Sequence, residues 1–299
     1  MDEIVKKFFL WKPIDQCWLN GILHNRIEND PDLQAFQLEL LRRTIKSDIY
    51  AKFPTHFESR LSFFKKIVTS LEKFCVESIL DEIYEASVPV RIVNQSNQYY
   101  KSYFNHTGEN HLCSLIETKE FVSQGTTGLQ TWPAAEFLYE YILQRRFSTP
   151  KVVLELGSGI GYLGISCLKH TNMFSKWIFT DHSDAVLDSL RNNIALNDIE
   201  DDKYQVQHLD WTRHSTNENS NHDILVASDV VFDQRIIPDL VLVLKFLMGN
   251  GQNAIVANVE RNEETKEAFE LNLAQNGLVF HLHKNENMLL YDIEMQKSS

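Results

Sequence analysis

The fold class is decided by the stretch VLELGSGIGYLG at residues 153–164. The apolar run ends at Leu156, and glycine follows at positions 157, 159 and 161. Glycine lets a chain turn tightly and approach a ligand closely, and a helix that begins here would offer free backbone N–H groups. The stretch therefore predicts a strand, a ligand-binding loop and a helix in immediate succession.

Around and after this stretch, apolar runs of strand length alternate with segments of helical periodicity. The predicted strands are Val152–Leu156, Trp177–Thr180, Tyr204–Leu209, Asp223–Val231, Asn253–Val259, Leu278–His283 and Met288–Met295. Such alternation is typical of a parallel, doubly wound sheet with right-handed crossovers. The link between the last two strands is too short for a crossover, so the last strand should be antiparallel. We predict an α/β fold with a doubly wound, seven-stranded, mostly parallel, Rossmann-like sheet and an antiparallel last strand.

Upstream of the stretch, the pattern changes twice. Residues 1–88 have helical periodicity, clearest in Phe57–Ala86, where apolar residues recur every three or four positions. Residues 89–124 contain two apolar runs, Tyr99–Phe104 and Leu112–Val122, on either side of a polar segment, which predicts a pair of strands. We expect an N-terminal helical extension at 1–88, a β-hairpin-like connecting segment at 89–124 and the doubly wound domain at 125–299.

The composition excludes several classes of protein. With 43% hydrophobic and 23% charged residues the chain is typical of globular proteins, and no apolar run reaches the ~18 residues of a transmembrane helix. The net charge of −12 argues against non-specific binding to nucleic acid or to an anionic membrane. Four widely spaced cysteines and the lack of a secretory signal favour a reducing compartment. We expect a cytoplasmic, monomeric protein with no metal site, no membrane contact and no direct contact with nucleic acid.

The glycine loop alone leaves two classes of cofactor open, because GIGYLG at residues 159–164 also fits the dinucleotide pattern G-x-G-x-x-G. Three features favour S-adenosylmethionine. Glu155 places a carboxylate two residues before Gly157, which suits a cationic sulfonium ligand better than a pyrophosphate. Asp210 and Trp211 end the third strand and offer an acidic and an aromatic side chain to an adenine. The third feature is the complete strand–helix series with its antiparallel ending.

Two further acids end predicted strands. Asp181 follows the second strand about 20 residues after the loop, the spacing at which an acid bonds the ribose hydroxyls; the alternative is a cap for the next helix. Asp229 follows the fourth strand, where it would orient or help desolvate an incoming amine, or instead cap a helix at Ile236–Met248. A lysine must lose its proton before it attacks a methyl group, since its free pKa is about 10.4. Trp132 precedes a predicted helix and forms either a wall of the cofactor pocket or part of the core.

Four motifs together resemble those of the seven-β-strand protein-lysine methyltransferases. They are GTTGLQTWPAA at 125–135, ELGSGIGYLG at 155–164, LDW at 209–211 and DVVF at 229–232. Four stretches are similar, more narrowly, to the lysine methyltransferases of eukaryotic translation elongation factor 2. They are Gly125–Trp132, the helical segment that ends DEIYEA at 81–86, YKSY at 100–103, and Val259–Thr265 with Arg261 and Asn262.

This resemblance implies an S-adenosylmethionine-dependent transfer of a methyl group to a lysine of a protein substrate, here elongation factor 2. The residues that would contact the cofactor are Trp132, Gly157, Ser158, Gly159, Asp181, Trp211 and Ser228. Asp229 and Phe232 match the family's D-x-x-Y element beside the substrate lysine. Phenylalanine stands at the last position, so this chain offers an aromatic wall there without the tyrosine hydroxyl.

Three alternatives stay open on the sequence alone. The same sheet carries methyltransferases of small molecules, since a fold does not fix the substrate. An inactive binding module could use the fold as a scaffold, although the complete glycine loop and both strand-end acids argue against this. A nicotinamide-dependent oxidoreductase would use a similar glycine loop.

Overall fold

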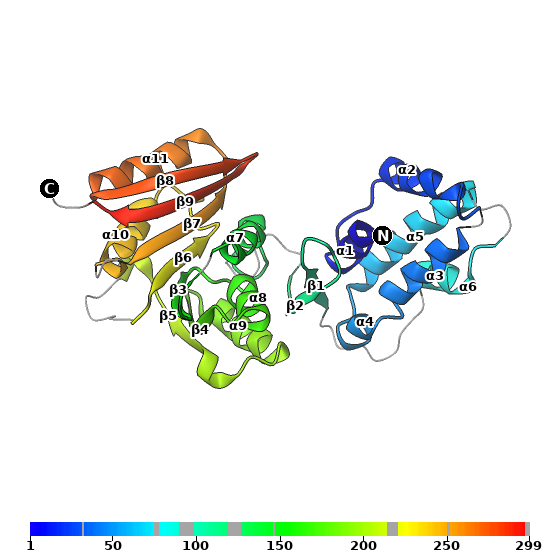
Figure 1. Cartoon of the computed structure of the whole chain (residues 1–299), viewed down its shortest axis with the longest axis horizontal. Helices are drawn as coiled ribbons and strands as arrows, with labels where there is room; N and C mark the ends of the chain where they lie inside the picture. Colours follow the sequence, from blue (N-terminus) through cyan, green and yellow to red (C-terminus); the bar gives the residue numbers. More distant parts are fainter. Residues whose placement is uncertain are drawn as a thin grey trace. The chain divides into compact units, whose positions relative to one another are not determined.

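The computed structural model describes residues 1–31, 33–74, 78–89, 99–118, 127–145, 147–213, 221–249 and 252–296. The chain divides into two compact units, Met1–Ile116 and Glu117–Ser299 (Figure 1). The predicted boundary after residue 124 lies in a segment outside the described residues. No helix in the described ranges is long and apolar enough to cross a membrane.

The first unit is a cluster of helices with a small hairpin. Its helices are α1 (Asp2–Phe9), α2 (Gln16–Ile27), α3 (Gln34–Arg43), α4 (Asp48–Lys52), α5 (Phe57–Phe74) and α6 (Asp81–Ser87). The periodic stretch predicted to be helical forms α5 and α6, and its residues Phe64, Ile67 and Ile83 are fully buried. Phe8 and Phe9 of α1 join this core, where Phe8 packs edge-on against Phe64.

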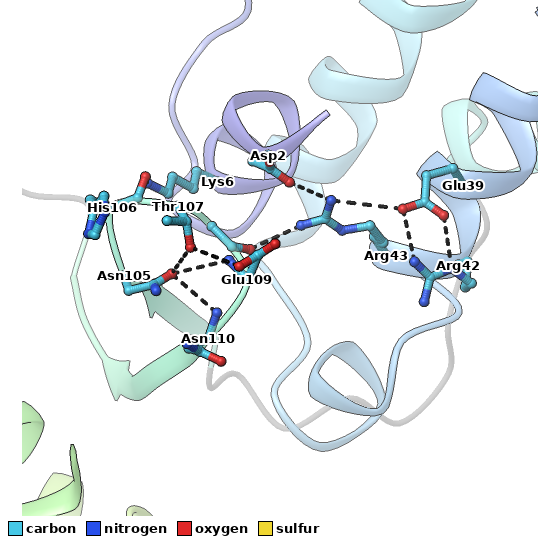
Figure 2. A network of polar contacts seen from close by, with 11 residues as sticks. Asp2, Lys6, Glu39, Arg42, Arg43, Asn105, His106, Thr107, Glu109 and Asn110 are labelled. Atoms are coloured by element: carbon cyan, nitrogen blue, oxygen red, sulfur yellow. Dashed lines mark hydrogen bonds and ion pairs between the residues drawn. The ribbon is translucent and has the colours of Figure 1, made fainter.

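The hairpin consists of β1 (Tyr100–Phe104) and β2 (His111–Ile116), which pair antiparallel. Its turn is held by the polar network in Figure 2. The Arg43 guanidinium on α3 donates to Asp2 at 2.5 Å and to the Gly108 carbonyl at 3.0 Å. Gly108 has a φ of +76°, and a Cβ there would lie 2.7 Å from Cβ of Asp2. The turn therefore requires glycine both for its backbone and for the close approach of α1.

The second predicted strand of the hairpin, Leu112–Val122, is wrong at its C-terminal end. The strand stops at Ile116, and residues 119–122 lie outside the described residues. Glu117 is buried and its carboxylate accepts hydrogen bonds from the Thr131 backbone N–H and hydroxyl, at 3.2 and 2.9 Å. These bonds hold Glu117 against the segment before α7 immediately after the strand ends.

The second unit is built on a seven-stranded sheet. Its strands are β3 (Lys151–Leu156), β4 (Phe174–Asp181), β5 (Tyr204–His208), β6 (Ile224–Ser228), β7 (Asn253–Val259), β8 (Leu278–Asn285) and β9 (Met288–Met295). They lie in the order β5-β4-β3-β6-β7-β9-β8. β3 to β7 are mutually parallel, whereas β9 runs antiparallel to both of its neighbours, β7 and β8. The predicted doubly wound sheet with an antiparallel last strand is confirmed.

Helices cover both faces of this sheet (Figure 1). One face carries α7 (Pro133–Leu143), α8 (Tyr162–His170) and α9 (Asp184–Leu196), and the other carries α10 (Ile237–Leu247) and α11 (Glu263–Gln275). α8 lies very close to the strands, because a Cβ on Gly164 would come within 2.3 Å of Phe179 and 2.5 Å of Trp177. Gly164 therefore allows α8, the helix that follows the glycine loop, to pack closely on the sheet.

The chain changes direction across the sheet between β3 and β6. From β3 it continues outward to β4 and β5, and it then crosses back to β6 on the other side of β3. In open α/β sheets such a switch point leaves a crevice at the carboxyl ends of the strands, where ligands bind. The glycine loop after β3 and the Ser228-Asp229 step at the end of β6 both lie at this edge.

Candidate active site

A cavity of about 570 Å³ lies at the carboxyl ends of β3, β4, β5 and β6, which is a usual size for a site that takes a small molecule. All the residues predicted from sequence to form the site line this cavity. They are Trp132, Glu155, Gly157, Ser158, Gly159, Asp181, Asp210, Trp211, Ser228, Asp229 and Phe232. The structure thus brings these residues together, and their contacts decide what each one can do.

The loop after β3 has a backbone that only glycine adopts easily. Gly157, Gly159 and Gly161 have φ values of +63°, +53° and +93°. A Cβ on Gly157 would lie 3.0 Å from Val230, and one on Gly159 would lie 3.1 Å from the carbonyl oxygen of Gly128. The loop is also tied to the neighbouring strand, because the Ser158 N–H donates to the Thr180 carbonyl at 2.8 Å. These glycines leave a shallow backbone cradle that any side chain would fill.

Asp181 ends β4 beside this cradle, with 8% of its surface exposed. One carboxylate oxygen accepts from the Gly159 N–H at 3.2 Å, and the other accepts from the Ser183 N–H at 3.1 Å. Burial raises the pKa of this carboxyl group. Each oxygen keeps a second lone pair, so Asp181 can steady the chain before α9 and still accept a ligand hydroxyl. The two roles considered from sequence are therefore compatible.

Glu155 forms the floor of the cavity and is only 1% exposed. The indole N–H of Trp177 donates to its carboxylate at 2.8 Å. Burial raises the pKa of Glu155 to about 8. At neutral pH this side chain is therefore largely protonated, and a cation in the cavity would favour its ionised form.

Asp210 and Trp211 differ in what they present to the cavity. The Asp210 carboxylate accepts from the N–H and hydroxyl of Thr212, at 3.0 and 2.8 Å, and so caps the short helix η2 (Trp211–Arg213). The Trp211 ring lies against the glycine loop, where its Cζ2 is 3.5 Å from the Cβ position of Gly157. The aromatic member of the predicted pair therefore forms a wall, whereas the acid mainly shapes the turn.

Asp229 follows β6 in the left-handed region, with a φ of +53°, which is uncommon for a residue with a side chain. Its Oδ2 accepts from the Ala134 N–H at the start of α7, at 3.3 Å. Its Oδ1 accepts from the Val259 N–H at 3.1 Å and from the Arg261 guanidinium at 3.2 Å. The alternative role as a cap for the following helix is wrong, because these bonds tie Asp229 to α7 and to the end of β7.

The structure gives a role at the site to two residues to which the sequence assigned none. Arg261 pairs with Asp229, and its guanidinium also lies over the Trp132 ring at 5.4 Å. Its position just after β7, at the carboxyl edge of the sheet, was the signal that could have found it. Glu117 holds the Thr131 segment before α7 and gave no sequence signal. Phe232 lies at the cavity, 48% exposed, so an incoming substrate can reach it.

The doubly wound sheet and the cavity at its switch point define a Rossmann-like methyltransferase fold. The chain belongs to a family described as lysine methyltransferase, which matches residues 114–275. It is therefore an S-adenosylmethionine-dependent protein-lysine N-methyltransferase, and the predicted family resemblance is confirmed.

Several relatives are similar over most of their length. The human protein-lysine N-methyltransferase EEF2KMT is 29% identical over 91% of this chain and 86% of its own. The mouse protein of the same name is 30% identical over 83% and 78%. Protein-lysine N-methyltransferase EFM3 of Chaetomium thermophilum is 28% identical over 85% and 84%. Among solved structures, a ribosomal protein L11 methylase from Lactobacillus delbrueckii subsp. bulgaricus is 17% identical over 62% of this chain and 95% of that chain, with a TM-score of 0.46.

Proposed function

We propose that this enzyme methylates a lysine of eukaryotic translation elongation factor 2. The observation that carries the proposal is the extent of the similarity to EEF2KMT, which covers 91% of this chain. That is more than the second unit contains, so the similarity continues into the helical first unit. A helical unit in addition to a unit with a complete cavity suits a macromolecular substrate. Because elongation factor 2 works in translation, we also propose that the enzyme is cytoplasmic. We propose separately that it acts as a monomer.

The donor set of the cavity fits S-adenosylmethionine, which supplies a methyl group on a positively charged sulfur when it is bound. The glycine cradle would allow the cofactor to lie directly against the backbone of the loop. We assign Asp181 to the ribose hydroxyls, since it is the buried strand-end acid beside the cradle. Trp211 and Trp132 would supply aromatic walls. Glu155 on the floor would meet positive charge.

The substrate lysine would enter beside Asp229 and Phe232. Its amine must be neutral to attack the methyl group, and a free lysine is almost fully protonated at pH 7. Three donors hold the Asp229 carboxylate in one orientation. A fixed acceptor can hold the amine in one place, so we assign Asp229 the task of positioning it. Phe232 would form an aromatic wall that excludes water. Positioning of this kind supplies much of the rate when the leaving group is already good.

The proposal is tested by incubating the purified full chain with elongation factor 2 and S-adenosylmethionine labelled in its methyl group. Mass spectrometry should find the label on a lysine of elongation factor 2. Gly157→Arg should abolish the transfer, whereas Gly21→Ala, where a Cβ meets nothing within 4 Å, should not. An unlabelled elongation factor 2, together with labelling of another protein or a small molecule in a cell lysate, would show that the substrate is wrong.

A further inference from the structure

Arg261 joins two residues that line the cavity and come from different parts of the chain, Asp229 after β6 and Trp132 before α7. Its guanidinium donates to Asp229 at 3.2 Å and lies over the Trp132 ring at 5.4 Å. The Asp229 side chain is 1% exposed, while that of Arg261 is 35% exposed. Trp132 in turn donates from its indole N–H to the Thr127 carbonyl at 3.1 Å. The arginine thus holds a carboxylate and an aromatic ring in one fixed arrangement beside the cavity.

The other charged groups near this arrangement are engaged elsewhere. After β6, Arg235 pairs with Asp233 at 2.6 Å. After β7, Glu260 pairs with Lys284 of β8 at 2.6 Å. Among the residues that the structure describes, Arg261 is the cation that pairs with Asp229.

The remaining charged groups around the cavity and behind Phe232 belong to other elements. Lys266 on α11 pairs with Glu263 and with Glu270, at 2.7 and 3.9 Å. At the far strands, Asp181 ends β4 with His182 beside it, and Asp210 pairs with Arg213. Glu155 of β3 lies on the floor of the cavity. None of these contacts brings a second positive charge to Asp229.

The pairing matters because of the proton on the substrate lysine. A bare carboxylate beside a lysine stabilises the ammonium form and so holds back the nucleophile. When the same carboxylate is paired with a guanidinium, its field at the lysine is largely cancelled. The carboxylate can then position the amine without holding its proton.

We propose that Arg261 is a positioning residue that neutralises Asp229 at the methyl-transfer site, so that the entering lysine gives up its proton more readily. This inference rests on the proposed placement of the lysine beside Asp229. The lysine proton leaves to solvent water first. The amine lone pair then forms the new N–C bond, while the C–S bond breaks and its electron pair stays on sulfur. Arg261 touches neither of these bonds and acts through Asp229 and Trp132.

The test is the pH dependence of single-turnover methyl transfer to elongation factor 2, measured with saturating full-length enzyme and cofactor. In Arg261→Gln, the uncancelled charge of Asp229 should move the midpoint of the profile upward by about one pH unit. The rate near pH 7.5 should then fall about tenfold and recover toward the wild-type rate at higher pH. Arg261→Lys, which keeps the positive charge, should restore most of the profile.

Lys284→Gln is the matched control, because it removes one positive charge from the neighbouring Glu260 and does not touch Asp229. Its profile should match that of the wild type. If Arg261→Gln lowers the rate by the same factor at every pH, Arg261 has only a structural role and the inference is wrong. If wild-type enzyme labels another protein instead, the proposed substrate fails, and the same pH series on that protein decides the role of Arg261.

Discussion

The two ends of the cavity are built in different ways. The glycine-loop end, which consists of residues 157–161 with Asp181, is shaped by backbone conformation and by the absence of side chains. The acid end, where Asp229 and Phe232 line the cavity and Arg261 pairs with Asp229, is shaped by a carboxylate with three donors around it. Substitutions at the first end should therefore act through steric exclusion, and those at the second through charge and anchoring.

The largest effect is expected at the glycine-loop end, from Gly157→Arg. A side chain at a φ of +63° adds backbone strain of ~1–3 kcal/mol, and its Cβ would lie 3.0 Å from Val230. The arginine would also fill the cradle, so affinity for S-adenosylmethionine measured by calorimetry should fall more than about a hundredfold, which corresponds to at least ~2.8 kcal/mol. Gly21→Ala should bind as the wild type does. Unchanged affinity in Gly157→Arg would place the cofactor elsewhere.

At the acid end, Asp229→Ala should abolish methyl transfer and also lower stability. The substitution leaves the Ala134 and Val259 N–H groups without their acceptor, because both donate to this carboxylate. We expect a loss of about 2–4 kcal/mol in the free energy of unfolding, measured by urea denaturation. Neither role considered from sequence, toward the incoming amine or as a cap of the helix at Ile236–Met248, includes these two donors.

Asp229→Asn separates the two roles, since asparagine keeps an acceptor oxygen and tolerates the left-handed backbone. It should recover part of the stability and little of the activity, because its NH2 group would face a donor at Ala134 or at Val259 and Arg261 and so displace the oxygen that positions the amine. Asp188→Asn, on an exposed pair with Arg191, should change neither quantity. A fully active Asp229→Asn enzyme would show that positioning of the amine does not need both carboxylate oxygens of Asp229.

The floor of the cavity should make stability depend on pH. Burial raises the pKa of Glu155 from 4.5 to about 8, so between these values the folded protein holds a proton that the unfolded chain releases. Stability therefore falls as pH rises through this window. Glu155→Gln removes this effect and keeps an acceptor for the Trp177 indole N–H. Its melting temperature relative to wild type should rise from about pH 4.5 to about pH 8. A constant difference across the window would contradict the buried, protonated Glu155.

Much of this architecture could be predicted from sequence because local patterns carry it. Apolar strand runs alternate with helical periodicity, and the rule that parallel strands share a carboxyl edge brings residues 155–161, 181 and 228–232 together. The parts that could not be predicted depend on contacts between distant segments. The pairing of Arg261 with Asp229 and Trp132 is of this kind, as is the bond from Thr131 to Glu117 just after the end of β2. The left-handed backbone of Asp229 has no local signal either, because an aspartate there is favoured only by the three donors that surround it.

The smallest effect is expected from Phe232→Tyr, which restores the hydroxyl of the family's D-x-x-Y element. Phe232 is 48% exposed, so a polar atom added to its ring meets solvent and stability should change by less than ~0.5 kcal/mol. The acid end already holds its carboxylate through Arg261, and the hydroxyl therefore adds little; the single-turnover rate should change by less than about threefold, a barrier change of at most ~0.7 kcal/mol. Phe232→Ala removes the aromatic wall and should instead raise KM for elongation factor 2 while cofactor affinity stays the same. A rate increase of tenfold or more in Phe232→Tyr would mean that the acid end is incomplete without the hydroxyl, and that charge pairing alone does not position the lysine.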